Sequence, residues 1–223
     1  KKLFGYEGDT IASALIANGI HLVGRSFKYH RPRGFFGAGV EEPNAKLQVE
    51  FNGHSEPNVN ATEMELVEGL SATSQNCWPS VNFDIGAINN FLKMFFPAGF
   101  YYKTFMWPKS FWYKIYEPFI RKAAGLGVAS IEKDKERYEH KFEYCDLLVT
   151  GSGPSGLASA YAAAKNGAKV ILAEDKPRFG GTLLTDDVSI DNLSGKDWAE
   201  KIITELKSMP NVTVKNRSQV FGY

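Results

Sequence analysis

The chain contains few of the residues from which protein redox and metal centres are commonly built. Its 223 residues include only two cysteines, Cys77 and Cys145, which lie far apart in the sequence. Without a C-x-x-C spacing, a redox disulfide pair, an iron–sulfur cluster and a cysteine zinc site are all unsupported. The scarcity of cysteine pairs favours a reducing compartment.

The chain also lacks an excess of charge of either sign and any long apolar run. With 26 basic and 25 acidic residues its formal net charge is +1, which gives no long-range reason to expect nucleic acid or an anionic membrane as a partner. No run of about 18 apolar residues occurs, and no secretory signal opens the chain. These absences favour a cytoplasmic protein with no membrane and no nucleic-acid partner.

Residues for acid–base or nucleophilic catalysis follow no motif. No Ser/His/Asp group stands at a motif spacing, and no cluster of metal ligands is present. The four histidines are scattered, and each is expected to be structural or solvated: His21, His30, His54 and His140. We therefore predict no catalytic residue and no metal site in this chain.

What the chain does contain is a nucleotide-binding motif between Asp146 and Thr182. The apolar residues 147–149 predict a buried parallel strand, and three glycines follow it with G-x-G-x-x-G spacing: Gly151, Gly153 and Gly156. In such a motif the first glycine forms the tight turn, the second lets the backbone approach a pyrophosphate, and the third lets the helix pack on the sheet. The pyrophosphate lies at the helix N-terminus, where N–H groups and the helix dipole favour an anion.

A second strand and an acidic residue complete this motif. An alanine-rich helix is predicted over 157–165 and a strand over 169–173. Glu174 ends that strand 23 residues after Gly151 (174 − 151 = 23), where such folds place the acid that binds ribose hydroxyls. A carboxylate there disfavours a 2′-phosphate, so NAD or FAD is favoured over NADP, although nearby basic residues such as Lys176 weaken this inference. The motif alone does not distinguish NAD from FAD.

The fold class is predicted to be α/β, and residues 1–76 are expected to form a β-grasp, ferredoxin-like domain without a cluster. The predicted elements are a hairpin strand over 1–10, a helix over 7–18 capped by Asp9, strands over 47–51 and 64–67, and a turn at Asn52 and Gly53. Residues 24–44 are rich in Gly, Pro and charge and are expected to be irregular.

Two further parts are predicted to follow. Residues 77–143 form an aromatic-rich connecting or interface segment, whose aromatic side chains are explained either by ordinary packing or by a large subunit interface. Residues 144–223 form the N-terminal part of a dinucleotide-binding domain, a partial Rossmann-type FAD/NAD(P)-binding fold with a helix over 196–208 and strands over 212–214 and 219–223. Because a domain of this type needs more strands, the chain is expected to be a piece of a longer polypeptide.

Several blocks of the sequence together resemble one family. The blocks are EGDTIASALIANGI, GRSFKYHRPRGFFGAGVEEPNA, NCWPSVNFDIGAINN, TGSGPSGLASA and RFGGTLL. They are similar to the N-terminal part of the alpha subunit of heterotetrameric sarcosine oxidases, and the resemblance covers almost the whole chain. It implies an oxidoreductase acting on CH–NH donors, which converts sarcosine to glycine by oxidative demethylation and forms hydrogen peroxide.

The same resemblance implies cofactors and partners. NAD is expected on this chain, FAD and covalently attached FMN in the assembled complex, mainly on the beta subunit, and tetrahydrofolate at a region outside this chain. The expected partners are the beta, gamma and delta subunits and a small-molecule substrate.

The resemblance also assigns residues around the nucleotide. The pyrophosphate is expected against Gly151, Ser152, Gly153, Pro154, Ser155 and Gly156, and the phosphates against Gly181 and Thr182. The adenosine ribose is expected among Glu174, Asp175 and Lys176, and the adenine edge at the backbone of Val220. For Asp175, Lys176 and Thr182 a plain surface loop is the alternative.

Two other functions stay open. One is a subunit of a related amino-acid or opine dehydrogenase, but such relatives keep cysteines in the β-grasp loop and this chain has none between Lys1 and Asn76. The other is a noncatalytic scaffold subunit whose bound NAD never changes redox state.

A basic loop over residues 24–34 requires a separate interpretation. It places five potential cations in nine positions: Arg25, Lys28, His30, Arg31 and Arg33. Arginine forks suit phosphate or carboxylate recognition, so we predict that the loop docks onto the beta subunit close to the flavin and helps to steer an anionic amino acid or to hold the FMN phosphate. The alternative is a solvated loop or ion pairs with Glu41 and Glu42.

Overall fold

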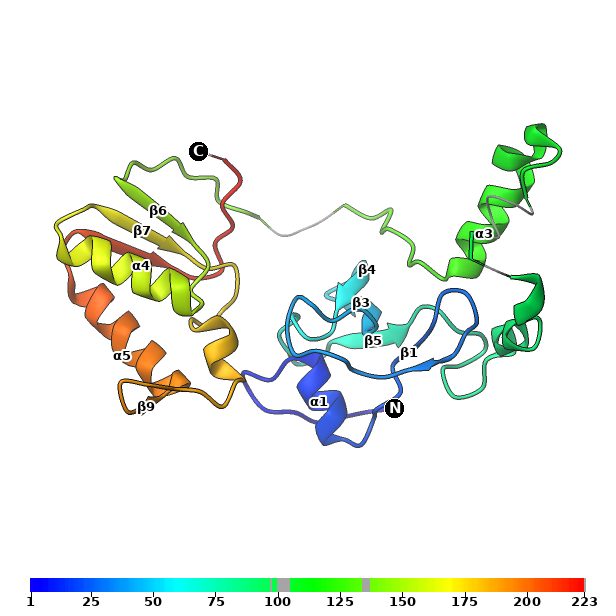
Figure 1. Cartoon of the computed structure of the whole chain (residues 1–223), viewed down its shortest axis with the longest axis horizontal. Helices are drawn as coiled ribbons and strands as arrows, with labels where there is room; N and C mark the ends of the chain where they lie inside the picture. Colours follow the sequence, from blue (N-terminus) through cyan, green and yellow to red (C-terminus); the bar gives the residue numbers. More distant parts are fainter. Residues whose placement is uncertain (97, 100–104, 134–136, 223) are drawn as a thin grey trace. The chain divides into compact units, whose positions relative to one another are not determined.

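The structure is a computed structural model, and it describes residues 1–96, 98–99, 105–133 and 137–222. The chain divides into two compact units, Lys1–Glu136 and Arg137–Tyr223. Each unit contains its own sheet, antiparallel in the first and parallel in the second (Figure 1).

The first unit packs a short helix against a small antiparallel sheet. Its sheet has the order β4-β3-β5, and the elements are α1 (Ile11–Ala17), β3 (Lys46–Phe51), β4 (His54–Asn60) and β5 (Ser71–Ser74). The side chains between helix and sheet form one apolar cluster: Ile11, Ala12, Val23, Ala45, Leu47, Val49 and Ala61. Burial of this cluster, rather than helix propensity, stabilises a helix as short as α1.

Thr10, not Asp9, is the N-cap of α1. The Thr10 hydroxyl accepts a hydrogen bond from the N–H of Ser13 at 3.2 Å, and Ser13 Oγ accepts one from the N–H of Thr10 at 2.9 Å. This reciprocal pair is a capping box. Asp9 instead accepts from the N–H of Tyr6 at 2.8 Å and from the Ser13 hydroxyl at 2.8 Å. The predicted helix over 7–18 therefore began too early, because Asp9 supports the turn that precedes the cap.

Strand β3 and the hairpin turn after it lie where the sequence predicts them. Asn52 and Gly53 have φ of +50° and +78°, the left-handed pair that a two-residue hairpin loop requires. The second strand was predicted wrongly, since residues 64–67 contribute only an isolated bridge between Thr10 and Glu65. The true partner, β4, is an edge strand that contains Pro57 and lacks a regular apolar alternation.

Smaller elements make up the rest of the described part of this unit. Residues 24–44 are mostly irregular but contain a short hairpin, β1 (Gly24–Arg25) paired with β2 (Pro32–Arg33). The later elements are η1 (Ile85–Asn90), η2 (Lys93–Phe95), η3 (Lys109–Phe111), η4 (Trp112–Tyr116) and α3 (Glu117–Ala124). Residues 1–9 form no strand, so the predicted hairpin strand over 1–10 is wrong.

Many aromatic side chains of the segment between the sheet and α3 are exposed. Phe91, Trp107 and Tyr113 are 85%, 83% and 83% exposed, and none of the described aromatic residues over 82–116 is among the buried core residues. Within the described residues, packing therefore does not bury these three side chains.

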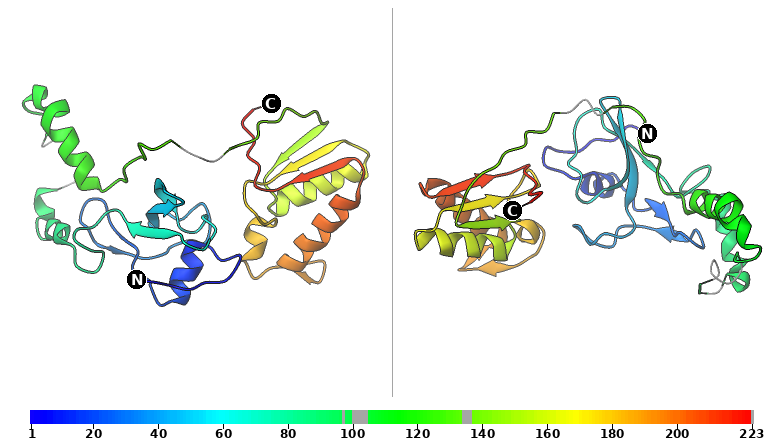
Figure 2. Two further views of the ribbon diagram at one scale, coloured as in Figure 1. Left: turned by 180° about the vertical axis from the view of Figure 1, so that it is seen from behind. Right: turned by 90° about the horizontal axis from the view of Figure 1, so that it is seen from above.

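The second unit is a parallel α/β fold. Its three-stranded sheet has the order β10-β7-β6, with β6 (Leu147–Thr150), β7 (Val170–Ala173) and β10 (Val212–Lys215). Helices α4 (Pro154–Lys165) and α5 (Gly195–Ser208) lie side by side on one face of the sheet (Figures 1 and 2). Between β7 and α5 lie η5 (Gly181–Leu184), β8 (Ser189–Ile190) and β9 (Leu193–Ser194).

The sequence predicts this unit well. The two helices and the three parallel strands lie within a few residues of the expected positions, because the alanine-rich helix α4 and the amphipathic helix α5 are long and Gly167, with φ of +87°, ends α4. One expectation fails, since residues 219–222 form no strand. The side chain of Phe221 instead contacts the rings of His140 and Phe142 at centroid distances of 5.8 and 6.0 Å.

Candidate dinucleotide site

The glycine loop between β6 and α4 has the backbone geometry that a phosphate site requires. Gly151 has φ of +90°, a conformation that favours glycine, and its N–H donates to the carbonyl of Ala173 at 2.7 Å. A β-carbon at position 156 would lie 2.1 Å from the carbonyl oxygen of Gly151. Gly156 therefore lets α4 begin directly beneath the turn.

The N-terminus of α4 is open. Gly153 is its N-cap, with φ of −63° and ψ of 179°, and no side chain caps the first turn. A β-carbon at position 153 would meet no atom within 4 Å, so the space in front of the loop is free. Pro154 and Ser155 are exposed in the first turn. The unpaired N–H groups of that turn are therefore available to an anion.

Glu174 stands at the end of β7, next to the glycine loop. It is only 5% exposed, and its Oε2 accepts hydrogen bonds from the N–H of Ser152 at 2.8 Å and from the Ser152 hydroxyl. Its Oε1 accepts from the N–H of Lys176 at 3.1 Å. Burial alone would raise the pKa of Glu174, but the hydrogen bonds from Ser152, Asp175 and the backbone lower it on balance.

Asp175 is exposed beside Glu174 and shares a hydrogen bond with it. That hydrogen bond, together with partial burial and the negative charge of Glu174, raises the pKa of Asp175. The opposite shifts of the two pKa values mean that Glu174 gives up its proton at a lower pH than Asp175 does.

Ser152 joins three parts of the site, which the sequence did not reveal. Its hydroxyl donates to Glu174 and accepts from the N–H of Gly180 at 3.1 Å. A β-carbon at Gly181 would lie 2.9 Å from the α-carbon of Gly153, so the start of η5 packs directly on the glycine loop. The only sequence signal for this contact is the pair of glycines before Thr182.

The remaining predicted residues border this arrangement. Thr182 is exposed on η5 and accepts the N–H of Thr185 at 3.1 Å through its carbonyl. The N–H of Ser218 donates to the carbonyl of Glu174 at 2.9 Å, which brings the C-terminal segment to the end of β7. Val220 follows two residues later and is half-buried.

The first unit offers no ligand set for an iron–sulfur cluster. Its only cysteine is Cys77, and no group of three or more His, Cys, Asp or Glu side chains among the described residues is placed to hold a metal ion. The loop before β3 instead surrounds the carboxylate of Glu42, which is 1% exposed. Its Oε2 accepts the N–H groups of Phe36 and Gly37, and its Oε1 those of Asn44 and Ala45. A cluster, which needs about four thiolates, does not fit this loop.

Both units match models of known protein families. Residues 1–77 match the model of a 2Fe-2S iron–sulfur cluster binding domain, and residues 146–211 match the model of FAD dependent oxidoreductases. The chain thus combines a ferredoxin-like domain, here without cluster ligands, with part of a Rossmann-type flavin oxidoreductase domain. The predicted fold class is confirmed.

Comparison with individual proteins shows which members of this class the chain is similar to. The chain is 57% identical over 219 residues to the alpha subunit of sarcosine oxidase from Rhizobium meliloti (strain 1021), covering 98% of this chain and 22% of that protein. It is 31% identical to the same subunit from Corynebacterium sp. (strain U-96), covering 100% of this chain and 18% of that protein. The chain is therefore a homologue of sarcosine oxidase alpha subunits, matches an N-terminal part of them, and spans about a fifth of their length.

A solved structure shows the same fold. The crystal structure of L-proline dehydrogenase from P. horikoshii matches 97% of this chain and 31% of that chain with a TM-score of 0.51 and 18% identity. At this identity the match concerns the fold alone. Across the described part of the chain, no helix is long and apolar enough to cross a membrane.

Proposed function

We propose that this chain is the NAD-binding part of the alpha subunit of a flavin-dependent sarcosine oxidase. The observation that carries the proposal is the open N-terminus of α4 beside the buried, ionised Glu174. An anion at the helix N-terminus and a carboxylate at the end of the next strand are the two recognition elements of a dinucleotide fold.

Each residue of the site then has one task. The backbone of residues 151–156 holds the pyrophosphate, with Gly181 and Thr182 on the opposite side. Oε1 of Glu174 has one backbone donor, the N–H of Lys176. Because Asp175 can donate to Glu174 only when it is protonated, an ionised Asp175 leaves this oxygen capacity to accept from the ribose hydroxyls. Asp175 and Lys176 border the ribose, and the backbone of Val220 borders the adenine.

The choice of NAD over NADP follows from charge. The lowered pKa of Glu174 keeps a negative charge where NADP carries its 2′-phosphate. FAD has the same adenosine half as NAD, so its exclusion rests on the resemblance to sarcosine oxidase alpha subunits.

The complete enzyme is proposed to oxidise sarcosine to glycine and to form hydrogen peroxide from oxygen. Bound flavins, FAD and FMN mainly on the beta subunit, supply the electron transfer, while tetrahydrofolate binds a region outside this chain. The beta, gamma and delta subunits are its partners in the cytoplasm. We also propose the division into residues 1–76, 77–143 and 144–223, with the exposed aromatic residues of the middle part at a subunit interface.

The direct test is to denature the purified complex and identify every released nucleotide by mass spectrometry. NAD released together with FAD, and FMN retained covalently on a partner chain, is the expected result. NAD that stays in one redox state through turnover would make the chain a scaffold. Release of FAD without NAD would contradict the proposal.

A substitution tests the site itself. Gly153→Ala adds a methyl group to free space, so the unit should fold with a loss of at most about 1 kcal/mol, because alanine is a poorer N-cap than glycine, but the methyl group lies where the pyrophosphate approaches. We expect NAD affinity to fall roughly tenfold or more. Ser159→Ala, on the exposed side of the same helix, is the control and should bind NAD as the wild type does.

Similarity to one further relative supports a second candidate substrate. The chain is 33% identical over 85 residues to an opine oxidase subunit from Agrobacterium tumefaciens (strain Ach5). An opine or other amino acid is therefore the second candidate substrate, and turnover of the purified complex with sarcosine and with opines decides between them.

A further inference from the structure

Residues 105–122 of the first unit form an aromatic segment that packs mostly against itself. The ring of Tyr116 contacts those of Phe105 and Phe111, at centroid distances of 5.3 and 6.2 Å. The Tyr116 hydroxyl donates to the carbonyl of Trp107 at 2.9 Å. The 105–122 segment therefore has a defined conformation, although none of its residues belongs to the apolar cluster between α1 and the sheet.

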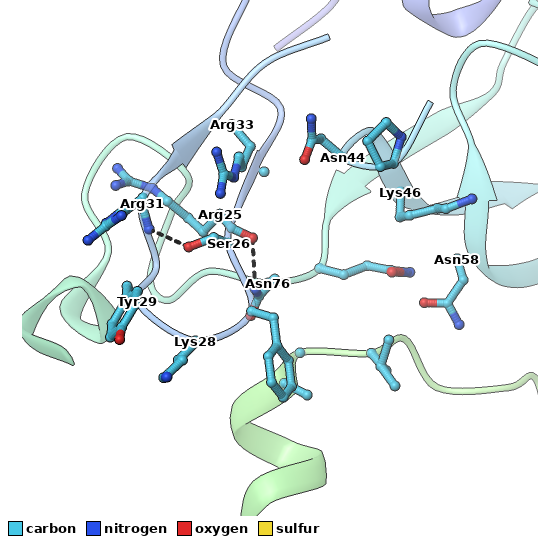
Figure 3. Close-up of a pocket in the computed structure, with 17 residues that line it drawn as sticks. Arg25, Ser26, Lys28, Tyr29, Arg31, Arg33, Asn44, Lys46, Asn58 and Asn76 are labelled. Atoms are coloured by element: carbon cyan, nitrogen blue, oxygen red, sulfur yellow. Dashed lines mark hydrogen bonds between the residues drawn. The ribbon is translucent and has the colours of Figure 1, made fainter. Parts of the chain in front are cut away.

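The end of α3 is fixed to β4 and to the residues that follow β5. Gly125 ends α3 with φ of +63°, and a β-carbon there would lie 2.5 Å from Oδ1 of Asn76. The amide of Asn76 in turn donates to the carbonyl of Arg25 at 2.8 Å (Figure 3). Two residues after Gly125, the N–H of Gly127 donates to Oδ1 of Asn58 at 3.2 Å. Because the end of α3 is held in this way, binding of a partner to α3 costs less conformational entropy.

One side of the helical part of this segment is apolar and exposed. Ile115 and Phe119 are four residues apart, and Phe119 and Lys122 are three apart, so these side chains are neighbours on the helix surface. Phe119 is 69% exposed and Ile115 is 49% exposed. Trp107, which precedes η3, is also largely exposed. Large apolar side chains gathered on a surface mark an interaction site, and truncation of aromatic residues at the centre of an interface often causes the greatest loss of affinity.

The unpaired charge of the 105–122 segment is of one sign. Its only acidic residue is Glu117, which forms an ion pair with Arg121 one helical turn away. Three lysines are exposed and form no ion pair with any described residue: Lys109, Lys114 and Lys122. A surface that is complementary to this segment must therefore supply carboxylates as well as apolar side chains.

A partner protein explains these features better than a membrane does. Aromatic side chains beside lysines also occur on helices that lie on anionic membranes, where the lysines form one basic face. Here the three lysines are instead distributed over η3, η4 and α3. Aromatic residues are enriched in protein–protein interfaces, and the similarity to alpha subunits implies a complex with other subunits.

We propose that the 105–122 segment docks against another subunit of the complex, on a surface that is apolar at its centre and has carboxylates at its rim. Ile115 and Phe119 bind the apolar centre, and Lys114 and Lys122 pair with the carboxylates. An apolar centre with a polar rim is the usual composition of a protein–protein interface. The inference rests on the proposed function, which places the middle part of the chain at a subunit interface, and adds which residues bind and what chemistry the partner's surface has.

The experiment measures the concentration at which the alpha subunit dissociates from the complete complex, by mass photometry during dilution. Phe119→Ser should raise this concentration roughly tenfold or more. The helix should remain folded, because Phe119 is exposed and serine and phenylalanine have similar helix propensities. Phe36→Ser, at a position that is 81% exposed and lies outside the segment, is the control and should dissociate as the wild type does.

A pair of charge variants tests the rim. The affinity of the wild-type complex should fall as the salt concentration rises, because salt screens ion pairs at an interface rim. Lys114→Gln/Lys122→Gln should weaken the complex at low salt and reduce this salt dependence. The control Lys196→Gln/Lys201→Gln removes the same charge from α5 and should keep the salt dependence of the wild type.

Three results would overturn the proposal. One is equal dissociation of the Phe119→Ser and Phe36→Ser complexes, and another is an unchanged salt dependence in Lys114→Gln/Lys122→Gln. The third is weaker binding of the Phe119→Ser complex to phosphatidylserine vesicles with unchanged subunit affinity, which would assign the segment to an anionic membrane. The nucleotides released from the same wild-type sample test the proposed function separately, so release of NAD together with any of these results refutes only the docking.

Discussion

Each unit of the chain contains one buried glutamate that collects backbone N–H groups, and the two differ in what they leave unused. Glu42 receives four backbone N–H groups, two on each oxygen. Glu174 receives two backbone N–H groups and one hydroxyl, its Oε1 has a single backbone donor, the N–H of Lys176, and Asp175 adds a hydrogen bond only when it is protonated. The hydrogen bonds that Glu42 accepts therefore all come from its own loop. Glu174 can still accept a further hydrogen bond next to the open N-terminus of α4.

Glu42 therefore has a structural role in the first unit, whereas Glu174 is proposed to bind a ligand in the second. In the first unit, which matches a cluster-binding family, an anionic side chain and not a cluster satisfies the loop N–H groups. In the second unit the carboxylate faces the place where a ligand is proposed. Substitution of Glu42 should therefore mainly lower the stability of its unit, whereas substitution of Glu174 should mainly lower NAD affinity.

The largest expected effect is that of Glu42→Ala. It leaves four N–H groups without their acceptor, and because each buried unsatisfied donor costs about 1–3 kcal/mol, we expect the first unit to lose at least about 3 kcal/mol of stability. Hydrogen exchange read by mass spectrometry reports this loss in β3 and β4 separately from the second unit. Glu68→Ala, at an exposed position, is the control and should change stability by less than about 0.5 kcal/mol.

The second largest effect is expected for Gly156→Ala, which tests the glycine loop of the second unit. Its β-carbon would lie 2.1 Å from the carbonyl oxygen of Gly151, so α4 must move away from β6 at a cost of about 1–3 kcal/mol. Exchange protection should fall in the second unit only, and NAD binding should be lost with it. Unchanged protection in α4 would show that the turn relaxes without strain.

Replacing each glutamate by glutamine compares the two sites directly. At position 42 the new amide NH₂ faces two N–H donors whichever way it turns, so stability falls. At position 174 the amide oxygen still accepts from Ser152, and the new NH₂ faces one N–H, that of Lys176, instead of two. We therefore expect a smaller destabilisation than at position 42 but a roughly tenfold loss of NAD affinity. Calorimetric titration with NAD and exchange protection measure both quantities. If Glu174→Gln destabilised its unit without affecting NAD affinity, the carboxylate would be structural in both units.

The two units also differ in how much of their structure the sequence predicts. The second unit has two long helical segments and a motif in which glycine spacing fixes the backbone, so its three parallel strands, its two helices and its glycine loop were found, whereas the predicted strand over 219–223 was not and the short strands β8 and β9 were missed. The first unit depends on contacts that have no periodic signature, such as the Thr10 cap, the edge strand β4 and the enclosure of Glu42. The sequence suggested Glu42 only as an ion-pair partner of the basic loop, because sequence cannot show that a loop folds around one of its own carboxylates.

The smallest expected effect is the response of each unit to acid. Burial alone would raise the pKa of Glu42, but the N–H groups of Gly37, Phe36, Asn44 and Ala45 lower it on balance. A carboxyl whose pKa is lower in the folded state contributes stability above its unfolded value, about 4.3, and loses it as the pH falls through the folded value. The first unit should therefore lose protection below about pH 4, and Glu42→Gln should flatten that loss.

The second unit should respond less steeply, because its two carboxyls shift in opposite directions. The pKa of Glu174 is lowered, which loses stability in acid, but that of Asp175 is raised by its hydrogen bond to Glu174. A raised carboxyl pKa means tighter proton binding in the folded state, so protonation of Asp175 offsets part of the loss. Exchange protection of both units, measured from about pH 7 to about pH 3.5 in the same sample, tests this. An equally steep loss in both units would mean that the opposite shifts at Glu174 and Asp175 do not compensate, and that Glu174 is as fully committed to its fold as Glu42.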